Sequence, residues 1–335
     1  MNASPKVSIV MAVRDGASYL QSTLESLRAQ TLPDYELIAV DDGSQDATPA
    51  ILDGWPDRRM IRIRNPSPLG LAASLNRGLE IARADYVARQ DADDLARPDR
   101  LAEQVSFLDA HSSVVLLGSS YHLIDEAGRN IGIQRQPCDD DAIRWQMLFH
   151  NAFCHSSVMA RRSCIEKSGF YDPSLTFAQD YDLWSRCLKF GQGANLDAPL
   201  ISLRQHMSSM SAVAKQEQQR TAGKIALSNM KDALGCEPDD TSAALLRSWY
   251  YGLPEQLPAG GAAAILLMRD LLKRRGTDRA KVQWARRLLR HPDAPVGPTI
   301  RYFIGQAPRA AMISLLLRLL GRTATRPDRV RKIAQ

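Results

Sequence analysis

The amino-acid sequence predicts an α/β fold, in which a mostly parallel sheet is flanked by helices. Apolar runs at residues 7–13, 35–40 and 84–89 are typical of buried strands, and amphipathic helical patterns separate them. Two of these runs end in clustered acidic residues, at 41–42 and 91–94. Sheets built from alternating strands and helices bind ligands beyond the carboxyl ends of their strands. Both acidic clusters are therefore expected at one edge of the sheet.

The helices between these strands are predicted from periodicity. Apolar side chains recur at helical intervals over 18–27, where Ser18 and Gln21 have the spacing of a capping box. A second helix is predicted over 69–82, and a third over 95–110 after the second acidic cluster.

The second cluster places three carboxylates, Asp91, Asp93 and Asp94, within four residues. Ionised carboxylates this close repel one another, so in folded proteins they usually surround a cation. Hard oxygen ligands suit Mg²⁺ or Mn²⁺, which can bridge to substrate phosphates. A solvated acidic turn is the alternative for an isolated cluster, but the acidic pair at 41–42 favours a site for a metal ion and a diphosphate. Asp94 is predicted to lie behind that site or to cap the following helix.

A resemblance to the family 2 glycosyltransferases of the GT-A fold is carried by three segments in order. They read VSIVMAVRDGASYLQSTLESLRAQTLPDYELIAVDDGSQDAT, NPSPLGLAASLNRGLEIARADYVARQDADD and HSSVMARRSCIEKSGFYDPSLTFAQDYDLWSRCLKFG. The resemblance extends over residues 5–211 and implies a Rossmann-like nucleotide-sugar-binding domain at 1–211. It also implies an inverting, metal-dependent enzyme that moves a sugar from a nucleotide diphosphate to a hydroxyl of a glycan or lipid-linked acceptor. Cell-surface polysaccharide synthesis is the implied context.

The resemblance assigns the nucleotide to the ends of the first two strands. Asp42 is similar to the residue that accepts a hydrogen bond from the base, a task that suits a carboxylate because it can only accept. Val13 is expected beside the base, and Arg14 could contact base or ribose. A uridine-type donor fits Asp42 best, while thymidine and guanosine stay open.

Three further donor-side residues belong to the second predicted helix. Asn76 and Arg77 are implied in nucleotide-sugar binding by the resemblance. Gly70, at the start of this helix, could let backbone N–H groups approach phosphate oxygens. A simple loop-to-helix turn is the alternative for Gly70, and both interpretations stay open.

The resemblance divides the metal motif between two carboxylates. Asp91 would reach the ribose or sugar and contribute to the metal site, and Asp93 would hold Mn²⁺ or Mg²⁺. His206, after a strand predicted at 200–203, is expected as a metal ligand or as a donor to the departing diphosphate, with a structural histidine as the alternative. His155 could line the acceptor side or make only backbone hydrogen bonds.

Sugar transfer also needs a group that takes the proton of the acceptor hydroxyl. Asp180 is the predicted base, by resemblance to a segment in which Glu commonly precedes this Asp; here Gln179 stands in its place. Asp180 could equally cap a helix predicted over 181–190, and both roles can hold together.

A helical C-terminal extension is predicted over 212–335, because a Ser- and Gln-rich stretch replaces the strand pattern near 207–219. Helices are expected at 226–233, 243–251, 262–273 and 282–289.

The end of the chain is strongly basic. Residues 271–335 carry a net charge of +13, which leaves −7 on residues 1–270. The tail at 308–335 contains an amphipathic helical pattern ringed by arginines, which could lie on an anionic membrane surface or pack on the catalytic domain. The tail has no interleaved aromatic residues, so no nucleic-acid partner is expected.

Composition predicts a cytoplasmic protein, which would be peripheral at the inner face of the cell membrane if the tail binds lipid. The five scattered cysteines have no metal-binding spacing, and no signal segment precedes the first strand. No apolar stretch reaches the roughly 18 to 20 residues of a membrane span.

Other functions are weighed against the transferase. A nucleotidyltransferase-like enzyme would want a Gly-rich phosphate loop after the first strand, and a dehalogenase-type phosphatase would want Thr or Val at Leu95. A non-catalytic nucleotide-binding protein is favoured by Gln179 but opposed by the three aspartates Asp91, Asp93 and Asp180.

Overall fold

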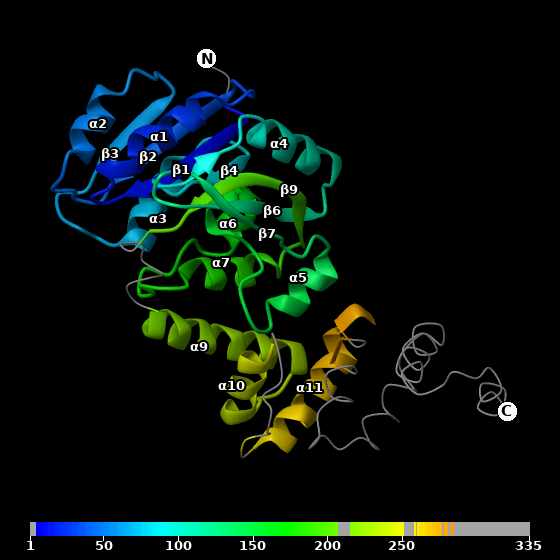
Figure 1. The fold of residues 1–335 in the computed structure, drawn as a ribbon. Coiled ribbons are helices and arrows are strands. Elements are labelled where there is room, and N and C mark those ends of the chain that lie inside the picture. The colour runs from blue at the N-terminus through cyan, green and yellow to red at the C-terminus, as the bar shows by residue number, and fades with distance from the viewer. Residues whose placement is uncertain are drawn as a thin grey trace. The chain divides into compact units, whose positions relative to one another are not determined.

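The computed structural model describes residues 5–206, 215–250, 258, 260–276, 278–280 and 283–284 (Figure 1). Contacts divide the chain into two units, Met1–Asn229 and Met230–Gln335. The first unit contains the sheet. The tail at 308–335, for which a membrane-binding helix is predicted, lies outside the described residues.

The sheet is mixed, and its first half is parallel. Its strands are β1 (Val7–Val13), β2 (Tyr35–Asp41), β3 (Met60–Arg64), β4 (Tyr86–Arg89), β5 (Leu95–Ala96), β6 (Val114–Ile124), β7 (Asn130–Gln134), β8 (Met159–Arg161) and β9 (Gln192–Arg204). They run in the order β3-β2-β1-β4-β8-β6-β9-β5, and β7 pairs with β6. Pairings among β3, β2, β1 and β4 are parallel, whereas β8 is antiparallel to both β4 and β6. The predicted α/β architecture is confirmed. The antiparallel pairing of β8 with β4 and β6 was not predicted, because periodicity does not show strand direction.

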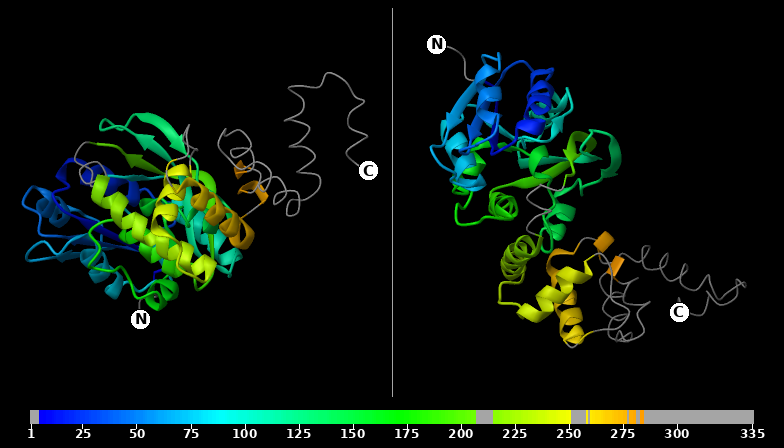
Figure 2. Two further views of the ribbon diagram at one scale, coloured as in Figure 1. Left: turned by 90° about the horizontal axis from the view of Figure 1, so that it is seen from below. Right: turned by 60° about the vertical axis from the view of Figure 1, so that its left-hand side comes forward.

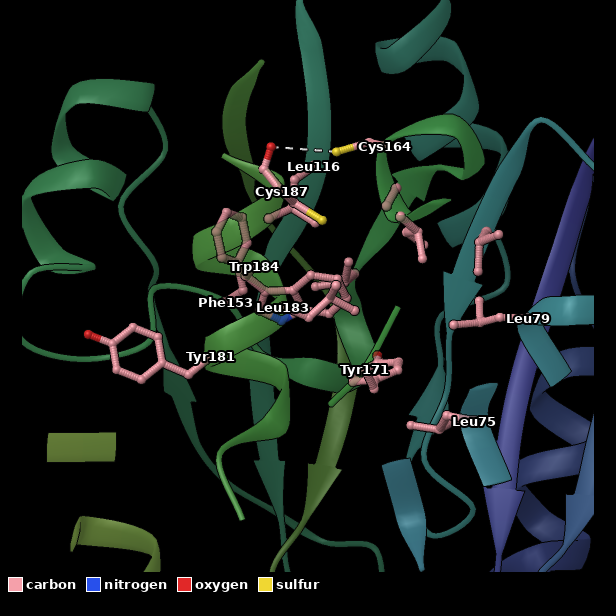
Figure 3. Close-up of a cluster of buried hydrophobic side chains, with 14 of the residues drawn as sticks. Leu75, Leu79, Leu116, Phe153, Cys164, Tyr171, Tyr181, Leu183, Trp184 and Cys187 are labelled. Atoms are coloured by element: carbon pink, nitrogen blue, oxygen red, sulfur yellow. Dashed lines mark hydrogen bonds between the residues drawn. The ribbon is translucent and has the colours of Figure 1, made fainter. Parts of the chain in front are cut away.

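Helices cover both faces of the sheet, as the ribbon views from different directions show (Figure 2). In the first unit they are α1 (Ala17–Arg28), α2 (Thr48–Gly54), α3 (Leu71–Ile81), α4 (Arg100–Ala110), α5 (Asp140–Gln146), α6 (Arg162–Lys167), α7 (Gln179–Cys187) and the first part of α9 (Lys215–Leu234), with the 3₁₀ turn η1 (His155–Ser157). Side chains of α1, α2 and α4 join one buried apolar cluster, and those of α3, α6 and α7 join the other. Figure 3 shows Leu75 and Leu79 of α3 in the second cluster with Leu183 and Trp184 of α7.

The central strands read as continuous apolar runs because both faces of the sheet are covered. In β1, Val10 contributes to the cluster with α3, while Ile9 and Met11 contribute to the cluster with α1. All seven residues of β1 are buried. The carboxyl ends of these strands are therefore fixed by packing on two sides.

The predicted capping box of the first helix is wrong. The N-cap of α1 is Gly16, and no side chain of the helix caps it. The free N–H groups are instead satisfied from the loop after β2: Gly16 N–H donates to Thr48 Oγ1 (2.9 Å) and Ala17 N–H to Asp46 Oδ2 (3.0 Å). A tertiary contact has replaced the local cap, which spacing alone could not reveal.

The helix predicted at 95–110 begins later than expected. Leu95 and Ala96 form the short strand β5, which pairs with β9, and α4 starts at Arg100 with Asp99 at its N-cap. Asp94 therefore does not cap that helix.

The helix α9 extends the first unit beyond the predicted domain end. Asn229 Nδ2 donates to Met147 O (2.7 Å) and to Ser185 Oγ of α7 (2.9 Å), and Ala226 is fully buried in the cluster that contains α7. The boundary at 211/212 stays a prediction, but residues 215–229 pack as part of the catalytic unit.

The second unit is helical where it is described. Its helices α10 (Asp240–Trp249) and α11 (Gly261–Arg275) match the predicted helices at 243–251 and 262–273. The predicted helix at 282–289 lies mostly outside the described residues. Among the described residues, no helix combines the length and apolar character that crossing a membrane requires.

Candidate active site

Asp42 follows β2 directly, and its carboxylate is held by the loop between β3 and α3. Its Oδ1 accepts hydrogen bonds from Asn65 Nδ2 and Leu69 N–H, both 2.7 Å, and its Oδ2 accepts one from Gly70 N–H (2.9 Å). Burial acts to raise the pKa of Asp42, but these donors outweigh it and hold the pKa below its usual value. Asp42 is therefore an ionised hydrogen-bond acceptor. Its Oδ2 accepts one bond, from Gly70 N–H, and can accept another.

The loops after β1 and β2 are bonded to each other at this edge. Asp15 N–H donates to Ser44 Oγ (2.9 Å), and Asp15 Oδ1 accepts from Gln45 N–H (2.8 Å). Gly43 has φ 71°, and a Cβ there would lie 3.0 Å from the backbone of Ser67 and Pro68. Only glycine fits this turn without displacing the loop that holds Asp42.

Two arginines flank this edge. Arg14, at the end of β1, has an exposed side chain 3.6 Å from Asp15. Arg64, at the end of β3, lies 3.3 Å from Asp41 Oδ2, as an ion-pair contact rather than a hydrogen bond. Sequence reasoning overlooked Arg64, although its position at the end of an apolar run was the available signal. Val13 is buried at the end of β1, as its place in the strand implied.

The three donor-side residues predicted in and before helix α3 make hydrogen bonds within the protein. Asn76 bonds the loop after α6 through Tyr171, with Nδ2 donating to Tyr171 O (2.8 Å) and Oδ1 accepting from Tyr171 N–H (3.0 Å). Arg77 donates to Asn65 Oδ1, and Gly70 N–H is committed to Asp42. A direct contact of Asn76 or the Gly70 N–H with the nucleotide would require these bonds to break.

Asp91 lies in the turn after β4 with its charge compensated inside the protein. Arg89 Nη2 donates to Asp91 Oδ1, and Ser156 Oγ donates to Asp91 Oδ2 (2.8 Å). Burial acts to raise the pKa of Asp91, but Arg89, His155 and the Ser156 hydroxyl together outweigh burial, and the pKa lies below its usual value. Neither Arg89 nor Ser156 was identified from the sequence.

Asp93 meets His206, 113 residues away in the chain, with Oδ2 and Nε2 2.9 Å apart. The end of β9 is held against the acidic turn, because Arg204 Nε donates to Asp93 O (3.0 Å) and Arg204 N–H to Asp94 Oδ1 (2.8 Å). Burial and the neighbouring Asp91 raise the pKa of Asp93. Asp94 is buried and braces β9, so it lies behind the acidic turn.

These residues fit a divalent cation in part. Asp93 and His206 offer one carboxylate and one imidazole, while the oxygens of Asp91 already accept from Arg89 and Ser156. Over the described part of the chain, no group of three or more His, Cys, Asp or Glu side chains is assembled to hold a metal. A metal ion here would need further ligands, and the oxygens of a diphosphate have the right chemistry.

A buried polar cluster supports the acidic turn from below. The guanidinium of Arg100 donates to Gln90 Oε1 (2.8 Å) and Arg89 O (2.8 Å), and Gln90 Nε2 donates to Asp94 O (3.0 Å). Burial lowers the pKa of Arg100 to about 10, so it stays charged at neutral pH. This buried cation, which the sequence did not reveal, faces a turn of three carboxylates.

Asp180 lies in the first turn of α7, after Ala178 in the left-handed conformation (φ 55°). Its Oδ1 accepts from Tyr181 N–H and its Oδ2 from Asn151 Nδ2, both at 2.8 Å. Burial, with a smaller effect from Asp91, raises the pKa of Asp180 to about 6. Gln179 is buried, and its Oε1 has no hydrogen-bond partner among the described residues. The alternative in which Asp180 is the N-cap of the helix is wrong, because Ala178 takes that position.

His155 is enclosed between the acidic turn and α7. Its Nε2 lies 3.1 Å from Arg89 Nε and 2.9 Å from Tyr171 Oη, and its ring contacts Trp184 edge-on. Because Arg89 can only donate, Nε2 accepts and the ring proton belongs on Nδ1. Burial, with Arg89 beside it, lowers the pKa of His155 to about 3, so the ring is neutral. From the sequence, His155 was expected to line the acceptor side or to make only backbone hydrogen bonds. Neither expectation included its side-chain contacts with Arg89 and Tyr171.

The fold has counterparts among solved structures. The chain shares its fold with S. aureus TarS residues 1–349 in complex with UDP-GlcNAc, at a TM-score of 0.60 and 16% identity over 96% of this chain and 93% of that chain. It also shares it with the mannosyltransferase PcManGT from Pyrobaculum calidifontis in complex with GDP-Man and Mn²⁺, at a TM-score of 0.52 and 17% identity over 96% and 89% of the two chains.

Sequence comparison then gives the family. The model of glycosyl transferase family 2 matches residues 8–169. The chain is 31% identical over 242 residues to an uncharacterized glycosyltransferase of Haemophilus influenzae, covering 69% of this chain and 75% of that protein. It is 35% identical over 211 residues to the putative glycosyltransferase EpsE of Bacillus subtilis, covering 61% and 75%. The chain belongs to glycosyl transferase family 2, and it is a glycosyltransferase.

Proposed function

We propose that this glycosyltransferase is metal-dependent and inverting, and that it moves a sugar from a nucleotide diphosphate, preferably a UDP-sugar, to a hydroxyl of a glycan or lipid-linked acceptor. The observation that carries the proposal is the unequal state of the two carboxylates after β4. Arg89 compensates the charge of Asp91, whereas the partner of the Asp93 carboxylate among the described side chains is the imidazole of His206. An incoming cation is therefore attracted to Asp93.

The donor side follows the carboxyl ends of β1, β2 and β4. Asp42 presents an ionised oxygen to an N–H of the base, with Val13 and Arg14 beside it. Asp91 retains acceptor capacity for a ribose or sugar hydroxyl after its bonds to Arg89 and Ser156. The structural neighbours are in complex with UDP-GlcNAc and with GDP-Man, which supports a nucleotide-sugar donor for this chain but does not identify the base.

Mn²⁺ or Mg²⁺ would be held by Asp93 and His206. When bound, the metal neutralises charge that develops on the departing diphosphate. The mannosyltransferase that shares this fold is described in complex with Mn²⁺, which supports the choice of a divalent ion.

Asp180 is the proposed base. The acceptor oxygen forms a bond to the anomeric carbon, the bond from that carbon to the diphosphate oxygen breaks with its electron pair leaving on the diphosphate, and the hydroxyl proton passes to the Asp180 carboxylate. Attack from the face opposite the leaving group inverts the anomeric carbon. The raised pKa of Asp180, about 6, makes it a stronger base than an ordinary aspartate while leaving it ionised at neutral pH.

The acceptor class rests on relatives. The chain is 33% identical over 188 residues to the amylovoran biosynthesis glycosyltransferase AmsE of Erwinia amylovora, of which it covers 70%. This relative supports polysaccharide synthesis as the setting of the reaction.

Calorimetry of UDP, GDP and dTDP binding, each with and without Mn²⁺, tests the proposal. One nucleotide is expected to bind clearly more tightly than the other two, and Mn²⁺ should strengthen that binding, because an ion held by Asp93 and His206 would offset the charge of the diphosphate. Absence of binding by all three nucleotides would overturn the proposed donor site.

The pH dependence of transfer follows from the raised pKa of Asp180. Only the ionised carboxylate can take the proton, so kcat should rise with pH through about 6 and level off above it. A Gln179→Glu variant, which is nearly isosteric, places a second buried carboxyl beside the base and should move this limb to higher pH. Asp180 would be contradicted as the titrating group if kcat rose near the ordinary aspartate pKa, or if the rise occurred at the same pH in Gln179→Glu as in the parent.

A further inference from the structure

We propose that residues 151–157, named here the bridge segment, set the separation between the base and the donor-side carboxylate, with Asn151 and Ser156 as positioning residues. The proposal rests on the proposed function, because it takes Asp180 as the base and Asp91 as the contact to ribose or sugar. One short segment bonds both carboxylates, which lie 89 positions apart in the chain.

At one end of the bridge segment, Asn151 is oriented toward Asp180. Asn151 Oδ1 accepts from Phe153 N–H (3.1 Å), which leaves Nδ2 facing Asp180 Oδ2 at 2.8 Å. Tyr181 N–H occupies the other oxygen. With one protein donor on each oxygen, the carboxylate has a defined rotation and still has lone pairs for an acceptor hydroxyl.

At the other end of the bridge segment, Ser156 makes two hydrogen bonds with Asp91. Its Oγ donates to Asp91 Oδ2 (2.8 Å) and accepts from Asp91 N–H (2.9 Å), so side chain and backbone are fixed by one hydroxyl. The neighbouring His155 adds a contact to Arg89, the cation that pairs with Asp91. The bridge segment therefore sets the position of the carboxylate and of its counter-charge.

The bridge segment is itself anchored in the core. Asn195 Nδ2 of β9 donates to Ala152 O (3.1 Å), and Gln104 Nε2 of α4 donates to Ser157 O (2.8 Å). Ser119 N–H of β6 donates to Ser157 Oγ (3.1 Å). Only Asn151 and His155 of the segment are less than fully buried. Hydrogen bonds from β9, α4 and β6 hold both ends of the bridge segment in place. A segment that sets the separation between Asp91 and Asp180 needs such fixed ends.

Steady-state kinetics on matched variants separate the two ends. Asn151→Asp keeps the acceptor for Phe153 N–H but turns the donor facing Asp180 into an oxygen, so kcat should fall about 10- to 100-fold with the donor KM little changed. Ser156→Ala removes both bonds to Asp91 and should raise the donor KM about tenfold or more, with a smaller effect on kcat. Ser156→Thr keeps the hydroxyl and should restore much of the donor KM.

Controls use the same changes at exposed positions outside the bridge segment. Asn130→Asp on the exposed hairpin and Ser113→Ala on the surface should leave both constants within about twofold of the parent, as surface changes usually do. Thermal melting checks that each variant is folded. Asn151→Ala, which adds no charge, replaces Asn151→Asp if that variant melts early, and it should also lower kcat.

The outcomes distinguish this proposal from the proposed function. If Asp180→Asn abolishes transfer while folded Asn151 and Ser156 variants keep the parental kcat and donor KM, the bridge is overturned and the base stands. If both variants lower kcat and raise KM in the same proportion as their loss of melting temperature, the segment is only structural and the proposal fails. If Asp180→Asn itself retains transfer, the base assignment fails first.

Discussion

Replacing Asp180 by Asn is expected to lower kcat about 10²- to 10⁴-fold, the range that a positioned general base contributes. Asparagine keeps the size of the side chain and an oxygen for Tyr181 N–H, but it cannot take a proton from the acceptor hydroxyl. Nucleotide binding should change little, because the residues proposed for the base and ribose follow β1, β2 and β4. The measurement is kcat with saturating donor, together with calorimetry of the nucleotide.

Asp182→Asn is the matched control for this substitution. Asp182 stands two residues further along α7 and pairs with Arg186, 2.5 Å away, in a half-buried (i, i+4) ion pair. Because Arg186 also donates to Ser168 O and Phe170 O, it stays in place without this pair, and the variant should retain most of the turnover. Equal losses in the two variants would mean that α7 tolerates no change of charge, and unchanged turnover in Asp180→Asn would remove it as the base.

Replacing Asp93 by Ala is expected to abolish the strengthening of nucleotide binding by Mn²⁺ and to lower kcat about 10²-fold or more, since a catalytic metal contributes several kcal/mol. The reason is the charge distribution after β4, where, among the described residues, the Asp93 carboxylate pairs with His206 and the Asp91 carboxylate pairs with Arg89. Calorimetry with and without Mn²⁺, on the parent and the variant, measures the effect directly.

Asp91→Asn separates the two carboxylates of the turn. Arg89 already compensates the charge of Asp91, so the metal effect should not depend on this carboxylate. The variant should bind the nucleotide sugar more weakly whether or not metal is present, and Mn²⁺ should still strengthen that binding. Asp34→Asn, at an exposed position before the first residue of β2, is the control and should behave as the parent. Loss of the metal effect in Asp91→Asn but not in Asp93→Ala would reverse the proposed roles.

Much of the fold could be predicted because its causes are local. The strands at 7–13 and 35–40 are apolar throughout since helices cover both faces of the sheet, and such runs are visible in any sequence. Where each run ends, the chain must turn polar, which is why Asp42 and Asp91 could be placed at the edge of the sheet. Element starts were less predictable: the cap of α1 comes from Thr48 and Asp46, far from the helix in sequence.

The contacts that define the candidate site could not be read from spacing. His206 was an expected partner of the metal motif, and the structure brings it to Asp93, although metal binding by this pair stays a proposal. Asn151 and Ser156 have ordinary polar side chains in an irregular segment, so no pattern singled them out. Their importance lies in which carboxylates they contact.

The alternation of strands and helices and the acidic residues at the strand ends are visible in the sequence, because periodicity and composition follow from which faces are buried. Tertiary contacts settle which carboxylate pairs with an arginine and which pairs with a histidine. Arg89 could pair with Asp91 or Asp93 as far as spacing shows, and the choice depends on Ser156 and His155, which reach the turn from 65 and 66 positions away. The electrostatic character of each carboxylate is a property of distant residues brought within hydrogen-bond distance.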